Sequence, residues 1–507
     1  MASWNNGYVT DSVYVSAFNR YATPAWLAVV ATLGGQPVPG LAAPFRYADL
    51  GCGNGLTALV VAATHPNAQV WGFDFNPAHI EFASELAASA GLTNVAFVET
   101  SFDAIATAGD QRLPPMDFVV THGVLSWISS ETEAALVHCI GRLLRPGGLL
   151  YVSYNVATSR ANMVPVRTLM RQLLRPVRGG TDAAVAEVLS RVERLREAGA
   201  AYFQLNPALE TLWAGLQSQD VRYLAHEYLN QDWRPLMFAD VAAHLEEAKC
   251  SFVASATLET NVLATAVPPG VIPLLAEIDD PATEETMRDL AAARSFRRDV
   301  FRRGRRPVRA QANSAAVDAL RFGSLHREAA GPPSFKTNFG TISTDAALHH
   351  ALTARLSAST ATVAELRDAL PGHTQAQIFQ ALLLLMEDSQ VHPMLADEIG
   401  GAGREPAQRL NRAMAAFNAS GGSLDRLAVP AMGTAIPCDA VDIAMVAAML
   451  EGGPADAEAL GREVLARLPV SASAASGEAE ALRQGVVLEV ERRLRRFRPA
   501  ALGVVAG

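Results

Sequence analysis

A glycine-rich turn near the start of the chain constrains its fold more than any other feature. Residues 49–55 read DLGCGNG; they end an apolar run, 45–50, that is typical of a buried strand, and they precede a predicted helix, 56–64. Glycines let the backbone turn sharply and approach a ligand closely, and the first N–H groups of the helix behind them attract an anion. This order of strand, turn and helix predicts a nucleotide-binding α/β fold.

The pattern continues to residue 155. Short apolar runs alternate with helical segments, which indicates a parallel sheet with helices on both faces. The further strands that we predict are Gln69–Phe73, Val95–Val98, Asp117–Thr121 and Leu149–Tyr154. The helices between them are predicted at Pro77–Ala90 and Glu131–Leu144. Five strands in this arrangement make a Rossmann-like, doubly wound sheet.

The spacing of the glycines indicates which cofactor the turn binds. Gly51, Gly53 and Gly55 form G-x-G-x-G with Asp49 two residues upstream, whereas dinucleotide enzymes prefer G-x-G-x-x-G. The first form is typical of class I methyltransferases, so we expect the methionine carboxylate of S-adenosylmethionine at the glycines and its amino group by Asp49. Asp74, at the end of the second strand, can accept bonds from both ribose hydroxyls. NAD stays an alternative cofactor, because Asp74 could bind the ribose of either. A second alternative is that residues 51–55 form only a tight turn and bind no ligand.

Other candidate cofactor residues follow the strands at the same edge of the sheet. They are Phe75 after the second strand, Ser101 and Phe102 after the third, near the expected adenine, and His122 and Gly123 after the fourth. The fourth strand faces the expected methyl donor. Phe102 is equally consistent with ordinary core, and His122 with a structural histidine, so His122 is not named as a base.

Several segments carry a resemblance to a known family. They are YVTD at 8–11, PAWL at 24–27, DLGCGNG at 49–55, GFDFNP at 72–77, HGVLSWI at 122–128, RPGGLLYVSYN at 145–155, YLAHEYLN at 223–230 and FRRDVF at 296–301. Together they resemble bacterial methyltransferases with a methyltransferase regulatory domain, over residues 5 to about 305 and more faintly through 427–430. The best-described members resemble protein-lysine methyltransferases that modify outer-membrane proteins, which implies a lysine acceptor.

The resemblance also implies that Tyr8 and Tyr14 fold over the cofactor as a lid. The alternative is a surface helix whose aromatic side chains pack on the sheet.

The acceptor site must hold a neutral amine, because lysine with its free pKa of about 10.4 is charged at neutral pH. Polar groups predicted to face this pocket are Tyr154 and Asn155 after the fifth strand, and residues 226–228 of the helical segment beyond it. We select Tyr154 and Glu227 as the catalytic candidates that orient the acceptor. For Glu227, a simple ion pair with an arginine is an equal alternative. HEYLN at 226–230 resembles the zinc motif H-E-x-x-H, but Asn230 removes a ligand, so no metal is expected.

The length of 507 residues predicts several domains. We divide the chain into an N-terminal lid region (1–44), the cofactor-binding core (45–157), a helical insertion and regulatory region that completes the core (158–309), and a mainly helical C-terminal half (310–507) that serves substrate choice. The third part contains a predicted strand at 251–258, a loop-rich connection at 267–281, and an arginine-rich run at 294–309. We interpret this run as a strand in preference to an arm that binds nucleic acid. In the last part, residues 360–391 suggest a winged helix.

Charge argues against nucleic acid as a partner. The net charge is −9, and residues 340–400 hold two arginines (355 and 367) against seven acids (345, 365, 368, 387, 388, 397 and 398), a net of −5. No apolar run reaches the roughly 18 to 20 residues of a membrane span, and the start lacks the form of a secretory signal, so a cytoplasmic protein is expected. The resemblance implies a bacterial one. The four cysteines show no metal spacing.

Three functions stay open. The first is a protein-lysine methyltransferase whose partner is a protein with an accessible lysine. The second is a small-molecule N- or O-methyltransferase, and the third is a cofactor-binding regulatory module without turnover. A homodimer is one assembly that the sequence allows.

Overall fold

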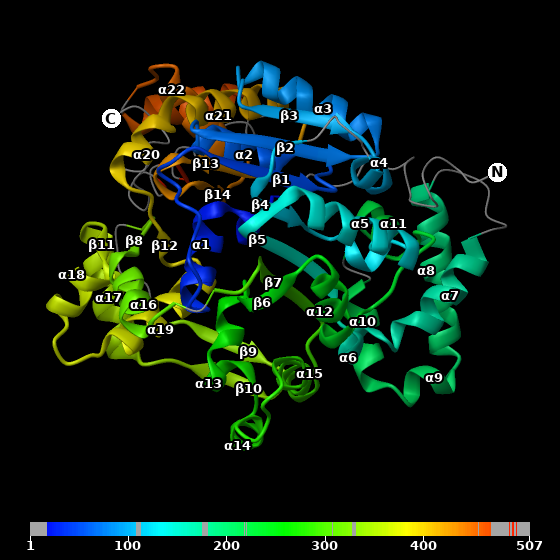
Figure 1. Cartoon of the computed structure of the whole chain (residues 1–507). Coiled ribbons are helices and arrows are strands. Elements are labelled where there is room, and N and C mark those ends of the chain that lie inside the picture. The colour runs from blue at the N-terminus through cyan, green and yellow to red at the C-terminus, as the bar shows by residue number, and fades with distance from the viewer. Residues whose placement is uncertain are drawn as a thin grey trace.

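A seven-stranded sheet with the order β3-β2-β1-β4-β5-β7-β6 forms the centre of the protein (Figure 1). The computed structural model describes residues 18–107, 113–174, 181–216, 219, 221–306, 308–326, 331–454, 456–467, 486, 489–490 and 493. The strands of this sheet are β1 (Phe45–Leu50), β2 (Ala68–Asp74), β3 (Val95–Glu99), β4 (Met116–Thr121), β5 (Leu144–Asn155), β6 (Cys250–Ser255) and β7 (Phe296–Arg303). The Rossmann-like sheet predicted from the sequence is confirmed.

The first five strands are parallel, and the last two extend the sheet in the antiparallel sense. β7 pairs with β5 along its whole length, from Leu149 opposite Arg302 to Asn155 opposite Phe296, and β6 adds to the outer side of β7. The strand predicted near 251–258 and the strand predicted in the arginine-rich run therefore both exist. The helical insertion lies between β5 and β6 along the chain.

Helices cover both faces of the sheet because its strands alternate their apolar side chains. On β1, Tyr47 belongs to the apolar cluster beneath α1 (Pro24–Leu33), α2 (Leu56–Thr64) and α3 (Pro77–Ser89), whereas Ala48 and Leu50 belong to the cluster on the opposite face. The helices of that second face are α4 (Phe102–Thr107), α5 (Ser130–Leu143) and α12 (Phe238–Glu247), and α15 (Pro281–Ala292) packs on α12. The sheet is thus buried on both sides, as parallel sheets require.

The insertion after β5 is helical, as predicted, and has an apolar cluster of its own. Its helices are α6 (Ala157–Arg160), α7 (Met163–Leu174), α8 (Thr181–Glu197), α9 (Ala201–Gln204), α10 (Pro207–Leu216) and α11 (Val221–Tyr228). Met170, Trp213 and Tyr228 are buried together at its centre, and Trp127 from the loop after β4 packs against them. This contact ties the insertion to the carboxyl ends of the central strands. The connection that follows contains two short helices, α13 (Leu263–Ala266) and α14 (Ile272–Leu275).

The C-terminal half is mainly helical. Its helices are α16 (Ala310–Ala319), α17 (Ala346–Ala358), α18 (Val363–Ala369), α19 (Gln375–Glu387), α20 (Asp397–Ala402), α21 (Arg404–Ala419), α22 (Ala440–Leu450) and α23 (Ala457–Arg467). Its strands are β8 (Arg321–Gly323), β9 (Ser334–Thr337), β10 (Gly340–Ser343), β11 (Ala361–Thr362), β12 (His392–Pro393), β13 (Arg426–Val429) and β14 (Thr434–Pro437). The predicted helix pair is present as α18 and α19, each begun by a capping box. The winged-helix interpretation of this pair stays a prediction.

This half packs directly on the helices of the sheet. α21 lies against α2 and α3 (Figure 1), and one apolar cluster joins Leu59 and Val60 of α2 to Leu410 and Met414 of α21. All nine residues of α2 are buried as a result. The boundary that the sequence suggests at 309/310 therefore separates segments that share a core. None of the helices in the described part of the chain has both the length and the apolar character needed to cross a membrane.

A close approach between the two halves tests this shared core. A Cβ atom on Gly403, between α20 and α21, would lie 2.6 Å from the carbonyl oxygen of Thr64 at the end of α2, whereas one on Gly401 would meet nothing within 4 Å. We predict that Gly403→Ala lowers the free energy of unfolding by about 1–3 kcal/mol through overpacking. Gly401→Ala, the matched control inside α20, is expected to raise it by about 0.5–1 kcal/mol. Urea unfolding of both variants measures the difference, and equal stabilities would contradict the close packing of the halves.

Candidate functional site

The glycine turn is shaped as a cradle between β1 and α2. Gly51, Gly53 and Gly55 have φ angles of +75°, +52° and +71°, which favour glycine. A Cβ atom on Gly51 would lie 2.6 Å from Cγ2 of Val124, and one on Gly55 would lie 2.5 Å from Cε1 of Phe97. A Cβ atom on Gly53 would meet nothing within 4 Å, so the middle of the turn borders open space. The positive end of the α2 dipole lies at this opening.

The Asp74 carboxylate at the end of β2 is held in a fixed orientation beside this turn. Its Oδ2 accepts a hydrogen bond from the backbone N–H of Gly53 (2.9 Å), and its Oδ1 accepts one from the N–H of Asn76 (2.9 Å) and lies 3.3 Å from Nδ1 of His79. Each carboxylate oxygen has further lone-pair capacity, which suits the two hydroxyls of a ribose.

Asp49 is buried at the end of β1, with 5% of its surface exposed. Burial, and then repulsion from the Asp74 carboxylate, raise the pKa of Asp49 to about 7. A cation bound next to Asp49 would stabilise the ionised form. The amino group of a methionine-containing cofactor is such a cation.

The loop after β4 is anchored by polar side chains of β5. The N–H of Gly123 donates to Oγ of Ser153 (2.9 Å), and Nδ1 of His122 lies 2.9 Å from the same oxygen and 3.0 Å from the hydroxyl of Tyr151. Burial, and then the positive charge of Arg298, lower the pKa of His122 to about 3, so its imidazole is neutral at physiological pH.

Asn19 connects the N-terminal segment to β5 and to α2. Its side-chain amide donates to the hydroxyl of Tyr151 (3.0 Å), and its backbone N–H donates to Oγ1 of Thr57 in the first turn of α2 (3.1 Å). Tyr8 and Tyr14, the predicted lid residues, lie outside the described residues.

The remaining candidate cofactor residues lie at the same edge. Ser101 is exposed and accepts a hydrogen bond from the N–H of Ala104 (3.2 Å) at the start of α4. Phe102, the first residue of α4, is partly buried against the apolar cluster on that face, and Phe75 directly follows β2 and is partly exposed. Their contacts with a cofactor, like that of His122, stay predictions.

The structure brings together two of the polar groups predicted for the acceptor pocket. Nδ2 of Asn155, at the end of β5, donates to Oε1 of Glu227 in α11 (3.4 Å). The indole N–H of Trp127 donates to the backbone oxygen of Glu227 (3.2 Å), and the N–H of Asn155 donates to Oγ of Ser126 (2.8 Å). Burial raises the pKa of Glu227 to about 7, although the bond from Asn155 and the charge of Arg160 act in the opposite direction. Among the described residues no ion pair to Glu227 forms.

Tyr154 points to the other face of β5. It is fully buried, and its hydroxyl donates to Oδ2 of Asp299 (2.8 Å), which also accepts from Nε of Arg297 (2.7 Å). Nη1 of Arg297 donates in turn to Oδ1 of Asp289 (2.8 Å). In this structure the Tyr154 hydroxyl therefore helps to join β5 to β7, and its catalytic role stays a prediction. The arginine-rich run is not a uniformly solvated face, because Arg297 is only 1% exposed.

The sequence reasoning missed Asn19, Tyr151 and Ser153. A signal for the last two was present, since Tyr151, Ser153 and Asn155 are polar residues at alternate positions of a strand and must share a face. No comparable pattern marks Asn19.

Comparison with known proteins gives the family. Residues 44–203 match the model of a methyltransferase domain, and residues 220–303 match that of a predicted methyltransferase regulatory domain. An uncharacterized protein of Synechocystis sp. is 31% identical over 436 residues, which are 86% of each chain. The chain belongs to the class I S-adenosylmethionine-dependent methyltransferases that carry a methyltransferase regulatory domain. The NAD alternative is thereby set aside.

Two further similarities, one over nearly the whole chain and one over a third of it, concern this methyltransferase. The structure of PKMT2 from Rickettsia typhi in complex with AdoHcy shares its fold, with a TM-score of 0.69 and 17% identity over 95% of this chain and 98% of that chain. The trans-aconitate 2-methyltransferase of Methylobacterium radiotolerans is 36% identical over 172 residues, 33% of this chain and 58% of that protein.

The cofactor of this methyltransferase is S-adenosylmethionine, and the geometry of the site fits it. The open middle of the glycine turn suits a carboxylate, the buried Asp49 suits an ammonium group, and the fixed Asp74 carboxylate suits ribose hydroxyls.

The titration of Asp49 gives a test of this assignment. The free carboxyl has a pKa of about 7, and a cationic cofactor favours its ionised form, so binding weakens as the pH falls below 7. We expect the dissociation constant for S-adenosylmethionine to rise by up to about tenfold per pH unit there. Asp49→Asn should flatten this profile and weaken binding at pH 8 by about 1.5–3 kcal/mol. Calorimetry at pH 5.5 to 8 measures both effects, with exposed Glu85→Gln as the control. A profile without pH dependence in the unmodified protein would remove Asp49 from the amino group.

Proposed function

We propose that this enzyme methylates lysine side chains of a protein acceptor. The observation that carries the proposal is the partly buried Glu227 carboxyl, with its pKa of about 7, next to Asn155 at the end of β5. The resemblance of the sequence to protein-lysine methyltransferases supports it, and the fold is shared with PKMT2 over nearly the whole of both chains.

Glu227 meets the main chemical need of a lysine acceptor. S-adenosylmethionine supplies an electrophilic methyl group on a sulfonium sulfur. The lysine Nζ must first lose a proton to expose its lone pair, and a carboxylate whose pKa lies near neutrality is a better proton acceptor than an ordinary glutamate. In the proposal, the proton passes from Nζ to the Glu227 carboxylate and then to water. The Asn155 amide keeps the carboxylate in place during this transfer.

The insertion provides the dry surroundings that this step requires. Trp127 packs against the apolar cluster of the insertion and holds α11 through its bond to the Glu227 backbone. A pocket that excludes water favours the neutral amine, because desolvation disfavours the charged ammonium.

We further propose that different segments of the chain bind the cofactor, form the acceptor pocket and select the acceptor. Residues 45–157 hold the cofactor, with Gly51 to Gly55 at the methionine carboxylate and Asp74 at the ribose, and residues 158–309 complete the acceptor pocket. Residues 310–507 select the acceptor. Six of the seven acids between 340 and 400 are exposed, and the seventh, Glu387, is bound by Arg20. An exposed acidic surface attracts a lysine-bearing protein.

A small-molecule acceptor is the second candidate. It is favoured by the 36% identity to trans-aconitate 2-methyltransferase, although that similarity covers only 33% of this chain. The two candidates differ in where a transferred methyl group is found.

Label transfer separates them. The enzyme is incubated with a bacterial lysate and S-adenosylmethionine labelled with tritium in its methyl group, and protein and small-molecule fractions are counted. We expect the label in protein, released as methylated lysine on acid hydrolysis. Label confined to the small-molecule fraction would overturn the proposal.

The role of Glu227 has its own test. Glu227→Gln keeps the shape and the bond from Asn155 but removes the proton acceptor, so we predict that kcat falls by about 10²–10³-fold while cofactor affinity stays unchanged. In the unmodified enzyme kcat should fall as the pH drops through about 7, because Glu227 then becomes protonated. This inflection should vanish in the variant.

The matched control is Glu246→Gln, an exposed glutamate of α12, which should leave kcat and its pH profile as they are. Full activity of Glu227→Gln would show that another group takes the proton.

A further inference from the structure

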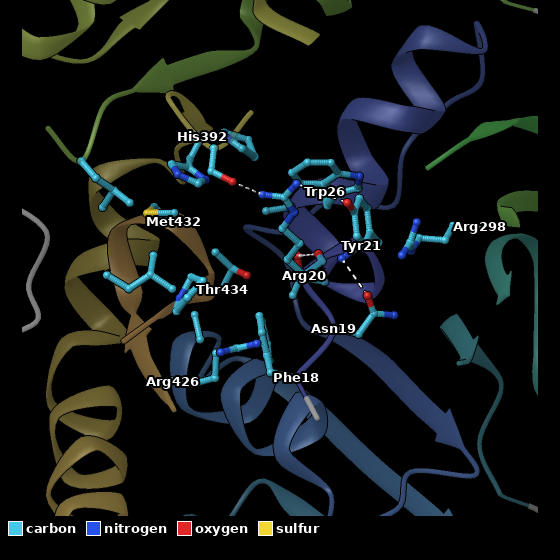
Figure 2. Close-up of a pocket in the computed structure, with 18 of the residues that line it drawn as sticks. Phe18, Asn19, Arg20, Tyr21, Trp26, Arg298, His392, Arg426, Met432 and Thr434 are labelled. Carbon is cyan, nitrogen blue, oxygen red and sulfur yellow. Dashed lines mark hydrogen bonds between the residues drawn. The ribbon is translucent and has the colours of Figure 1, made fainter. Parts of the chain in front are cut away.

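A cavity of about 410 Å³ lies where the N-terminal segment meets the C-terminal half. Residues 18–26 form one wall, β12 and the β13–β14 hairpin form another, and His122 and Arg298 also border it. In Figure 2 Arg20 lies near the centre, His392 and Thr434 lie across from it, and Trp26 and Phe18 flank it. None of the catalytic candidates lines this cavity.

The charged side chains that line the cavity are all positive. Its lining contains three arginines, Arg20, Arg298 and Arg426, and no aspartate or glutamate. Arg20 pairs with Glu387 (3.3 Å) and Arg426 with Asp425 (2.8 Å), both outside the lining. Arg298 forms no ion pair in the described part of the chain, although its charge interacts electrostatically with Glu259, which is also outside the lining.

Arg298 is held in place by aromatic rings. Its guanidinium carbon lies 4.5 Å from the ring centre of Tyr21 and 4.9 Å from that of Phe296, and its Nη1 donates to Oγ1 of Thr257 (3.3 Å). Its Nε is buried and finds no acceptor among the residues that the structure describes. This arginine is thus a preorganised cation with unused hydrogen-bonding capacity.

Two further polar atoms of residues that line the cavity lack partners. His392 and Thr434 are only 6% and 7% exposed, and within the described residues neither Nε2 of His392 nor Oγ1 of Thr434 makes a hydrogen bond. Leaving a buried polar group unsatisfied is costly. Both residues line the cavity, so a ligand that reaches these atoms would remove this cost.

We infer that this cavity binds a small organic anion, carried as a carboxylate or a phosphate on a partly apolar body, as a ligand separate from the methyl acceptor. The arginines supply the counter-charge, His392 and Thr434 supply neutral hydrogen-bonding groups, and Trp26, Met432 and Ile436 supply apolar walls.

Asn19 couples this cavity to the cofactor site. It lines the cavity, and its backbone and side chain bond to Thr57 of α2 and to Tyr151, whose hydroxyl lies 3.0 Å from His122. A ligand that holds residues 18–26 in place therefore also holds the bonds of Asn19 to α2, which follows the glycine turn, and to Tyr151, which contacts His122. Linkage then requires that the anion and S-adenosylmethionine raise each other's affinity by the same factor.

Citrate and inorganic phosphate are the probes, tested separately on the full chain by calorimetry and thermal unfolding. Sodium chloride at equal ionic strength is the control. We expect one or both anions to bind, to raise the melting temperature, and to increase the affinity for S-adenosylmethionine; citrate alone would assign a carboxylate ligand and phosphate alone a phosphate. No binding of either anion beyond the effect of sodium chloride would overturn the inference. So would transfer of labelled methyl to citrate, because the cavity would then hold an acceptor.

Variants of residues that line the cavity test whether the anion binds there. Arg298→Gln and Thr434→Val should each weaken binding of the effective anion by about tenfold or more, as expected for the loss of one hydrogen bond to a charged group. Thr434→Val should not lower the stability of the ligand-free protein, because the hydroxyl that it removes has no partner there.

Ser357→Ala, which removes another buried and unpartnered hydroxyl away from the cavity, is the matched control and should leave binding unchanged. Unchanged affinity in both cavity variants would overturn the inference. These measurements use no lysine acceptor, so their failure is distinct from a failure of the proposed function.

Discussion

The hydrogen bond from the Gly53 N–H to the Asp74 carboxylate is the contact on which the cofactor site depends. It joins the turn after β1 to the end of β2, and it forms only because Gly53 adopts a left-handed conformation. The N–H groups of Gly51 and Cys52 also donate hydrogen bonds to the backbone oxygen of Phe73, which further joins the turn to β2. The acidic residue is thereby oriented before any ligand arrives, so little ordering entropy remains to be lost on binding. Next to it, Asn19 of the N-terminal segment bonds to Thr57 in the first turn of α2, and Val124 of the loop after β4 lies against Gly51.

Much of the fold could be predicted because its signals are local. The strand before the glycine turn, α2 after it, and the strand in the arginine-rich run each follow from a short stretch of sequence. Side-chain partners could not be predicted in the same way. The Tyr154 hydroxyl donates to Asp299, which is 145 residues away in the sequence, and the Asn19 amide donates to Tyr151, which is 132 residues away. Alternation assigns a strand residue to a face but does not say what lies on that face. Glu227 was predicted to lie near Asn155, and the structure agrees, because both flank the carboxyl end of one strand.

Burial explains how carboxyl groups in one protein acquire different roles. Asp49 and Glu227 both have pKa values raised to about 7, and in both desolvation is the largest cause. Around Arg297 the acids instead face a cation, and Asp289 and Asp299 serve to connect α15, β7 and β5. Asp49 and Glu227 have no ion-pair partner in the described part of the chain, which is consistent with the ligand contact proposed for Asp49 and the proton transfer proposed for Glu227.

The position of β7 and β6 bears on how such enzymes can diversify. The segment that matches a methyltransferase domain ends at residue 203, yet two strands of the sheet come from the segment matched by the regulatory domain. A gene fragment for the first segment alone would encode a sheet whose β5 has an unpaired edge, which invites association with other chains. Recombination of these segments as independent cassettes is therefore disfavoured. New acceptor specificities are expected to arise by substitution on surfaces of an intact chain rather than by exchange of its parts.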